Sequence, residues 1–280
     1  MYRIVRKEVL NPTVILYEIE APMIAKKAQP GQFIILRVDE EGERIPLTIH
    51  DSDTTKGTVS IIVQTVGATT EKLSHKEQGE FLQDFVGPLG RPTETEGRKK
   101  VCVIGGGLGC AIAYPILKKF HENGTEVHAV VGFKNKDFVI LEEEFKAASD
   151  VLKLCTDDGS YGQKGLVTAA LQELIDGGNQ YDEVIAIGPP IMMKFIAKTT
   201  EPYGIRTTVS MNPLMVDGTG MCGCCRLTVG GETKFACVDG PDFDGHQVDW
   251  DEMMKRGKMY GEWERHKREE TCNLLSKEVK

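Results

Sequence analysis

Four of the eight cysteines in the chain lie within one short segment, where their spacing is suited to binding a metal cluster. In a chain expected to stay in a reducing compartment, such a group indicates metal binding rather than disulfides. A plant-type [2Fe–2S] site has the pattern C-x4-C-x2-C followed later by a fourth cysteine. Cys222 and Cys225 fit the middle of that pattern and Cys237 fits its end, whereas the first position holds Asp217.

The fourth ligand of this site has two candidates. An aspartate carboxylate can bind iron, so we predict that Asp217, Cys222, Cys225 and Cys237 hold a [2Fe–2S] cluster. The rival is Cys224, which lies between two ligands in a tight loop and is expected to point elsewhere. A zinc knuckle and a group of structural thiols are the other interpretations. Zinc would suit four cysteines, but the second CxxC pair of a zinc knuckle is missing.

A glycine-rich segment has the composition of a dinucleotide-binding loop. Gly105, Gly106, Gly107 and Gly109 follow the apolar run 101–104 and precede a predicted helix, which we expect Pro115 to begin near its first turn. Glycines allow the backbone to approach a pyrophosphate, whose charge a helix N-terminus favours. The spacing is not a strict GxGxxG, and the alternative is a tight strand-to-helix turn.

Two later loops are placed to complete the nucleotide site, because ligands bind at the carboxyl ends of parallel strands. Asp157, Asp158 and Gly159 follow the third predicted strand of this region, and Gly188, Pro189 and Met192 follow the fourth. The two aspartates would hydrogen-bond ribose hydroxyls and repel a 2′-phosphate, which favours NAD(H) over NADP(H). The alternative is that they form a cap and a turn.

The elements that must position these residues change in character along the chain. Up to about residue 97, short alternating strands at 13–20, 32–38 and 58–65 with a short helix at 69–75 and an exit loop at 87–92 predict a small β-barrel. From residue 98 to 211, strands alternate with helices and predict a doubly wound parallel sheet, the α/β fold of nucleotide domains. The cysteine segment then occupies 212–247, and a charged helical tail occupies 248–280.

Composition narrows the function classes. The 280 residues carry a formal net charge of -8, which disfavours nucleic-acid binding because phosphates need a basic face. The longest uncharged stretch, 101–117, is too short to cross a bilayer, and the first residues lack the apolar core of a signal peptide. We therefore expect a cytoplasmic protein without a membrane segment. No Ser/His/Asp or Cys/His set demands a nucleophilic mechanism, so we predict no catalytic side chain.

The barrel followed by a nucleotide domain that ends in GPPIMM resembles the ferredoxin–NADP reductase superfamily, which binds a flavin on its barrel through an RxYS-like motif. The resemblance implies an FAD site. In the matching segment Leu47 stands where the flavin-stacking tyrosine would be, and Arg44 is displaced by one position. The implied contacts are Arg44, Pro46, Leu47, Thr48, Val63, Gln64, Thr65, Gly67, Thr69 and Thr70, of which the last three open a predicted helix suited to the flavin pyrophosphate. The alternative for both segments is a strand edge and a helix cap.

The order of barrel, nucleotide domain and cysteine segment also resembles the electron-transfer subunit of dihydroorotate dehydrogenase. Asp217 and the tail residues 238–246 are more similar to the small subunits of NADH-dependent reduced ferredoxin:NADP oxidoreductases. That resemblance implies FAD, a [2Fe–2S] cluster and NAD(H) in this chain. It also implies a larger flavoprotein partner with [4Fe–4S] clusters, and coupling to ferredoxin and NADP by electron bifurcation. We expect the partner to be reached from the cysteine segment and from the tail around Met253, Met254, Met259, Tyr260 and Trp263. An electron-transfer subunit for dihydroorotate oxidation, or a regulatory NAD-sensing zinc protein, remains as the alternative.

Overall fold

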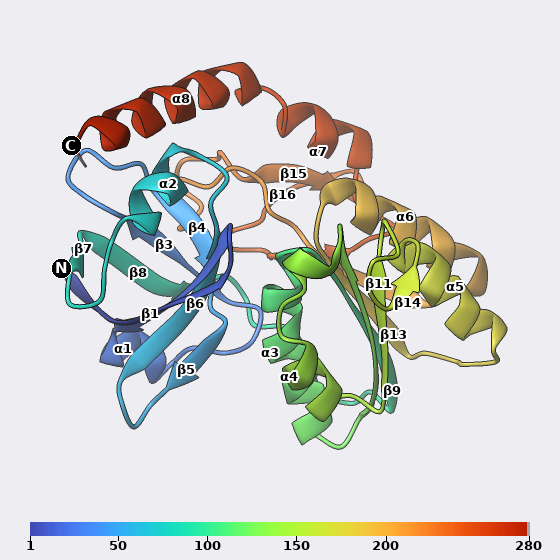
Figure 1. The fold of residues 1–280 in the computed structure, drawn as a ribbon. Helices are drawn as coiled ribbons and strands as arrows, with labels where there is room; N and C mark the ends of the chain where they lie inside the picture. Colours follow the sequence, from blue (N-terminus) through green and yellow to red (C-terminus); the bar gives the residue numbers. More distant parts are fainter. Residues whose placement is uncertain (279–280) are drawn as a thin grey trace.

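The computed structural model describes residues 1–278, with side chains to residue 272. The chain forms a β-barrel, an α/β domain beside it, and a C-terminal portion that runs back across both (Figure 1). The last two residues of the predicted tail, 279–280, lie outside the described residues.

The barrel consists of a five-stranded sheet in the order β5-β6-β2-β1-β7 and a three-stranded sheet in the order β4-β3-β8. Both sheets pack around one apolar core, which includes Ile34, Leu36 and Phe85. The strands are β1 (Tyr2–Asn11), β2 (Val14–Glu20), β3 (Phe33–Arg37), β4 (Ile45–Thr48), β5 (Asp51–Asp53), β6 (Thr58–Gln64), β7 (Phe81–Leu82) and β8 (Asp84–Leu89), and the helices are α1 (Pro22–Ala25) and α2 (Ala68–Ser74).

Two strands of the barrel differ from the sequence-based expectation. β1 precedes the first predicted strand and pairs with β2 along its length, with two register irregularities. The predicted exit loop at 87–92 begins inside β8, which pairs with β3. Glycine and proline made that segment look like a turn, but β8 lies at the edge of its three-stranded sheet, where a proline is tolerated.

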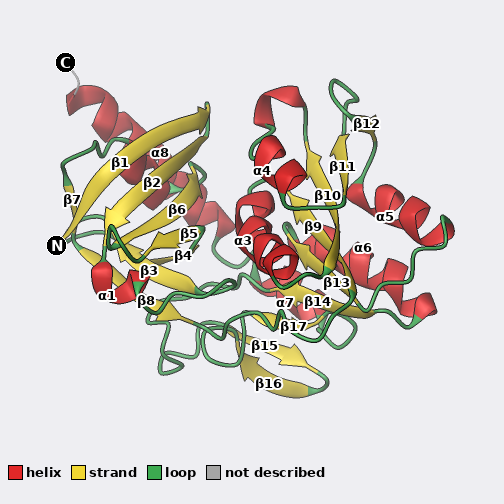
Figure 2. Ribbon diagram, turned by 90° about the horizontal axis from the view of Figure 1, so that it is seen from below, coloured by secondary structure: helices red, strands yellow, loops and turns green. Residues whose placement is uncertain are grey.

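The α/β domain has a seven-stranded sheet in the order β12-β11-β10-β9-β13-β14-β17, in which only β17 is antiparallel. Helices α3 and α4 cover the face toward the barrel, and α5 and α6 cover the other face (Figure 2). The strands are β9 (Lys100–Gly106), β10 (Glu126–Phe133), β11 (Val151–Thr156), β12 (Gln163–Lys164), β13 (Glu183–Ile187), β14 (Arg206–Ser210) and β17 (Asp242–Asp244); the helices are α3 (Gly109–Glu122), α4 (Glu142–Ala147), α5 (Val167–Asp176) and α6 (Pro190–Thr200), with 3₁₀ turns at Lys136–Phe138 and Glu201–Tyr203. The doubly wound prediction is confirmed.

Helix α3 begins at Gly109, so the prediction that Pro115 starts it is wrong. Proline has no N–H to donate to the carbonyl four residues earlier, which here belongs to Ala111. The Nδ1 atom of His50, from the barrel, lies 2.8 Å from that carbonyl oxygen and takes the place of the missing donor. A proline inside a helix is therefore tolerated through a contact between the barrel and the α/β domain.

The C-terminal portion joins the other parts of the molecule. A hairpin of β15 (Arg226–Val229) and β16 (Glu232–Phe235) carries helix α7 (Trp250–Arg256), which also packs on α6. Helix α8 (Gly261–Glu278) then crosses to the barrel and packs on α2 (Figure 1). Across residues 1–278, no helix has the length and apolar character needed to cross a membrane.

Candidate cofactor and cluster site

The predicted cluster donors lie in two pairs. Cys225 and Cys237 are buried, and their sulfur atoms are 3.2 Å apart. In the other pair, the Asp217 carboxylate accepts the Cys222 backbone N–H at 2.9 Å. Among the side chains that the structure describes, up to residue 272, no three from His, Cys, Asp or Glu gather around a single point in a way that would hold one metal ion. A two-iron cluster needs two protein ligands on each iron, and paired donors fit that requirement.

Asp217 is fixed by its own loop. Its carboxylate also accepts the Thr219 N–H at 2.9 Å, and these backbone donors hold the pKa of the carboxyl below its usual range. The side chain is therefore ionised and close to the start of the cysteine loop. The sulfur of Cys224 is 3.9 Å from the Cys222 carbonyl oxygen, and the Cys224 thiol also interacts with the Cys222 thiol, so Cys224 lies close to one of the predicted ligands.

The cysteine loop lies directly on the outer face of the barrel. A Cβ atom at Gly218 would come within 2.6 Å of Leu89 and 3.1 Å of Ile35, so only glycine permits this approach. Phe33 and Ile35 of β3 belong to the same apolar cluster as Cys225 and Cys237. Neither residue was predicted from the sequence to be part of a site. The unbroken apolar run in 33–36 was the available signal, because such a strand is buried on both faces.

The predicted flavin contacts on β4 divide between its two faces. Leu47 packs against the barrel core and pairs with Ile34, which points inward. Strand alternation places Pro46 and Thr48 on the opposite face, opposite Ile35 and Phe33, which pack toward the cysteine loop. Leu47 therefore lies on the face away from the cysteine loop. Arg44 is half exposed, with its guanidinium 3.8 Å from the Asp84 carboxylate.

The second predicted flavin segment closes on itself. The Thr70 hydroxyl accepts the N–H groups of Val66 and Gly67, each at 2.9 Å, and donates to the Gly67 carbonyl. Thr69 is buried, with its hydroxyl 3.4 Å from Glu43. Val63 and Gln64 are the last two residues of β6, and Thr65, which follows them, donates its N–H to the Thr13 carbonyl. Gly67 has open space around it and leaves the start of α2 accessible.

The predicted nucleotide loop lies where the strand order reverses, between β9 and β13, which is the usual ligand position in this type of sheet. Gly109 packs so closely on β13 that a Cβ atom would collide with the Ile187 carbonyl oxygen. Gly107 has a φ of +56° and open space around it, so the loop presents bare backbone to a ligand. Gly106 and Gly188 both pack around the Met192 side chain, which brings the first and last nucleotide loops together.

The two aspartates after β11 have different surroundings. Asp158 accepts the Ser160 N–H at 2.9 Å and the Ser160 hydroxyl at 2.6 Å, and these contacts hold the pKa of its carboxyl below the usual range. The Asp158 side chain therefore stabilises the turn of residues 158–160, which contains Gly159. Asp157 is exposed and only its backbone N–H is used, in a bond to the Phe133 carbonyl. The ribose-binding prediction therefore fits Asp157, whereas the turn alternative fits Asp158.

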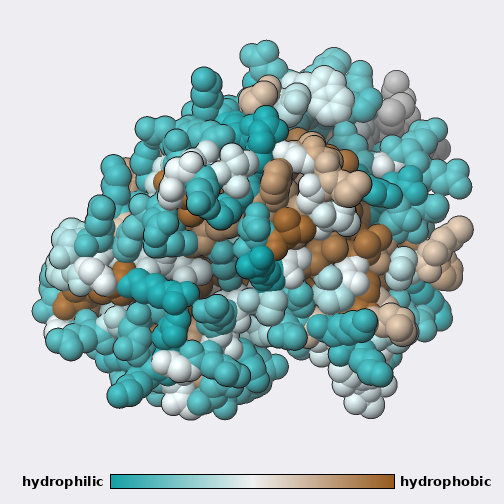
Figure 3. Space-filling model, turned by 180° about the vertical axis from the view of Figure 1, so that it is seen from behind, coloured by the Kyte–Doolittle hydropathy of each residue, from teal (hydrophilic) through white to brown (hydrophobic). Residues whose placement is uncertain are grey.

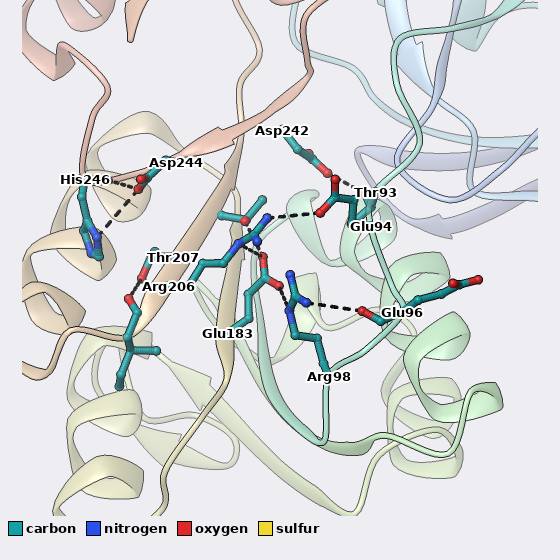
Figure 4. Close-up of polar contacts among 12 residues, drawn as sticks. Thr93, Glu94, Glu96, Arg98, Glu183, Arg206, Thr207, Asp242, Asp244 and His246 are labelled. Atoms are coloured by element: carbon teal, nitrogen blue, oxygen red, sulfur yellow. Dashed lines mark hydrogen bonds and ion pairs between the residues drawn. The ribbon is translucent and has the colours of Figure 1, made fainter. Parts of the chain in front are cut away.

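The junction between barrel, α/β domain and cysteine segment is polar (Figure 4). Glu183 is buried at the start of β13, and its carboxylate pairs with Arg98 at 2.7 Å and Arg206 at 3.2 Å. Next to this group, Thr93 from the end of the barrel donates to the Asp242 carboxylate at 2.5 Å. Strand β17, which carries Asp242, is thereby bound to the end of the barrel, and it also pairs with β14 of the α/β domain.

These features define a class. A flavin-type barrel, a nucleotide domain with its ligand loops at the switch point, and a cysteine segment against both make an NAD(H)-linked oxidoreductase unit for electron transfer. Residues 103–198 match the oxidoreductase NAD-binding domain, and residues 212–249 match the iron–sulfur cluster binding domain of dihydroorotate dehydrogenase B. These matches confirm the predicted NAD(H) and iron–sulfur cofactors, and the reductase-type barrel fold supports the predicted FAD.

Whole-chain comparisons identify the family. The chain is 48% identical to the dihydroorotate dehydrogenase B electron transfer subunit homolog of Thermotoga maritima, over 94% of this chain and 92% of that protein. It is 34% identical to the electron transfer subunit of Streptococcus pneumoniae, over 86% of this chain and 94% of that protein. The chain belongs to the family of dihydroorotate dehydrogenase B electron-transfer subunits and their homologues.

Among solved structures, a chain of the NADH-dependent reduced ferredoxin–NADP oxidoreductase, determined for insight into flavin-based electron bifurcation, superposes with a TM-score of 0.91. It is 44% identical and the match covers 98% of each chain. A ferredoxin reductase of carbazole 1,9a-dioxygenase, 16% identical, shares the fold with a TM-score of 0.58 over 73% of this chain and 65% of that one. The predicted fold class and the predicted resemblance are both confirmed.

Proposed function

We propose that this chain is the electron-transfer subunit of a bifurcating NADH-dependent ferredoxin:NADP oxidoreductase. The observation that carries the proposal is the whole-length match, at 44% identity, to a chain of such an enzyme. The aspartate at the first position of the cysteine pattern supports the same assignment. The chain serves as the NAD(H) end of the complex.

We assign the cofactors to parts of the chain as follows. Residues 1–97 hold FAD on the outer face of β4 and at the start of α2, 98–211 hold NAD(H), 212–247 hold the cluster, and 248–280 form the tail. When bound, FAD exchanges two electrons with a nicotinamide and single electrons with a one-electron carrier, which the chain needs to connect NAD(H) to iron. Pro46 and Thr48 pair with Ile35 and Phe33, which pack toward the cysteine loop, so these two apolar residues would form a wall shared by both sites.

The two donor pairs suggest how the cluster is held. Asp217 with Cys222 binds one iron and Cys225 with Cys237 binds the other, which follows the order of ligands along the chain. Cys224 is not a ligand in this assignment. The Cys224→Ser variant should keep the cluster and its EPR signal, whereas Cys225→Ser should lose it. Loss of the cluster from Cys224→Ser with an unchanged spectrum for Asp217→Ala would give the fourth position to Cys224.

We also propose an obligate larger partner that binds next to the cysteine segment. Four exposed apolar side chains come from this segment: Leu214, Val216, Met221 and Val238, with Met221 87% exposed. Apolar surface also gathers in the middle of the face shown in Figure 3. Of the tail residues expected to reach a partner, Met259, Tyr260 and Trp263 are exposed and Met254 is half-buried, whereas Met253 is buried in the chain's own core and is excluded.

Anaerobic purification from the native host tests the proposal. The chain should co-purify with a larger flavoprotein, and the complex should reduce NADP⁺ rapidly only when NADH and reduced ferredoxin are both present. Omitting either donor is the matched control. A complex that instead couples dihydroorotate oxidation to NAD⁺ would refute the proposal. It would make this chain an electron-transfer subunit of dihydroorotate dehydrogenase B, as several relatives are named. Zinc in place of iron would refute both.

A further inference from the structure

Helix α7 contacts the cysteine segment through two side chains, Glu252 and Arg256, which lie about one helical turn apart on the helix. The Glu252 carboxylate accepts the Thr228 N–H at 3.1 Å, on the first strand after the cysteine loop. Arg256 donates from Nη2 to the Cys224 carbonyl oxygen at 3.1 Å, inside the loop itself. Residues four apart share a helix face, so both contacts come from the same side of α7.

The helix that presents Arg256 is itself firmly held. Asp249 caps its start by accepting the Glu252 N–H at 2.9 Å. The Trp250 ring donates to the Gly245 carbonyl at 3.0 Å, and Met253 is buried in the apolar cluster that contains Cys225 and Cys237. The Arg256 guanidinium therefore has a fixed place over the backbone between two of the proposed ligands. A cation held there is not a mobile surface charge.

A fixed cation next to the loop has an electrostatic consequence. Three thiolates and a carboxylate give the cluster site an excess of negative charge, and each electron taken up adds one more. A nearby positive charge stabilises the reduced form more than the oxidised form, so it raises the midpoint potential. A second arginine, Arg226, donates to the Gly223 carbonyl at 3.1 Å, but it belongs to the loop's own strand. Arg256 is the one that comes from the tail.

We infer that Arg256 is a positioning residue through which the C-terminal tail fixes the cysteine loop and raises the midpoint potential of its cluster. The inference rests on the proposed [2Fe–2S] site. It assigns to the tail a role inside this chain, in addition to any contact with a partner.

Redox titration of the purified complex, followed by EPR of the reduced cluster, tests the inference. Arg256→Gln should shift the midpoint potential to a more negative value with flavin content and far-ultraviolet circular dichroism unchanged. Arg256→Lys keeps the charge, so its midpoint potential should stay close to the wild-type value. Lys255→Gln, an exposed residue on the same helix, removes the same charge without a contact to the loop and should leave the potential at the wild-type value.

The outcomes separate this inference from the proposal beneath it. An Arg256→Gln potential equal to that of the wild type, or a Lys255→Gln shift just as large, overturns the positioning role while the cluster assignment stands. A wild-type complex without a [2Fe–2S] signal overturns the cluster assignment and the inference together. Loss of the cluster from Arg256→Gln but not from Lys255→Gln supports the role in holding the loop.

Discussion

Asp242 should make the stability of the protein depend on pH in a direction opposite to that of most aspartates. Its carboxyl is buried where the cysteine segment meets the barrel and β14. Burial, together with the nearby Glu183 carboxylate, raises the pKa of Asp242 from 3.8 to about 6, against the lowering effect of hydrogen bonds from Thr93 and Ser210. One carboxylate oxygen has no hydrogen-bond partner among the described residues.

The size and sign of the effect follow from linkage. The folded protein holds this proton more tightly than the unfolded chain, so the protonated carboxyl contributes stability that is complete below about pH 4 and is lost as the pH rises through about 6. A pKa difference of about 2 units corresponds to about 3 kcal/mol. The Asp242→Asn variant is neutral at every pH and should gain about 3 kcal/mol relative to the wild type between about pH 4 and pH 7.

Urea unfolding at a series of pH values, followed by far-ultraviolet circular dichroism, measures the difference in unfolding free energy between the two proteins. The change of this difference with pH is the test, because any constant cost of the amide cancels. The control is Asp176→Asn, which removes an exposed carboxylate at the end of α5 and should give a flat difference. A flat difference for Asp242→Asn as well would refute the reasoning from burial.

Three further predictions concern the junction and the nucleotide site. His50→Phe removes the donor that replaces the missing helix N–H and should cost about 1–3 kcal/mol in urea unfolding, and an unchanged midpoint would contradict that role. Gly109→Ala collides with the β13 backbone and should lower the melting temperature by more than Gly107→Ala, whose Cβ atom has space and which bears only the cost of a left-handed backbone at φ +56°. Gly107→Ala should also weaken NADH binding measured by titration, and equal melting temperatures for the two variants would be inconsistent with the packing. Asp157→Asn should raise the rate of flavin reduction by NADPH relative to NADH in stopped flow, and Asp158→Asn should change this ratio less, because its carboxylate is engaged by the turn; the reverse order would exchange their roles.

The sequence alone determined the type of fold, the cofactor classes and the family. Strand and helix periodicity gave the barrel and the doubly wound sheet, because these patterns are local. The spacing of Asp217, Cys222, Cys225 and Cys237 indicated a two-iron site for the same reason, since a short loop keeps its ligands together. The switch-point loops could also be anticipated, because parallel strands direct their carboxyl ends to one edge.

Tertiary structure decided which face and which neighbour each residue has. Pro115 appeared to start a helix, but the helix extends on both sides of it, and His50 from the barrel contacts the carbonyl that Pro115 leaves without an N–H donor. Leu47 matched a motif position, yet strand alternation turns it toward the barrel core. Met253 appeared to be available to a partner but is buried in the core. In each case the decisive partner is far away along the chain, and a one-dimensional pattern carries no record of such contacts.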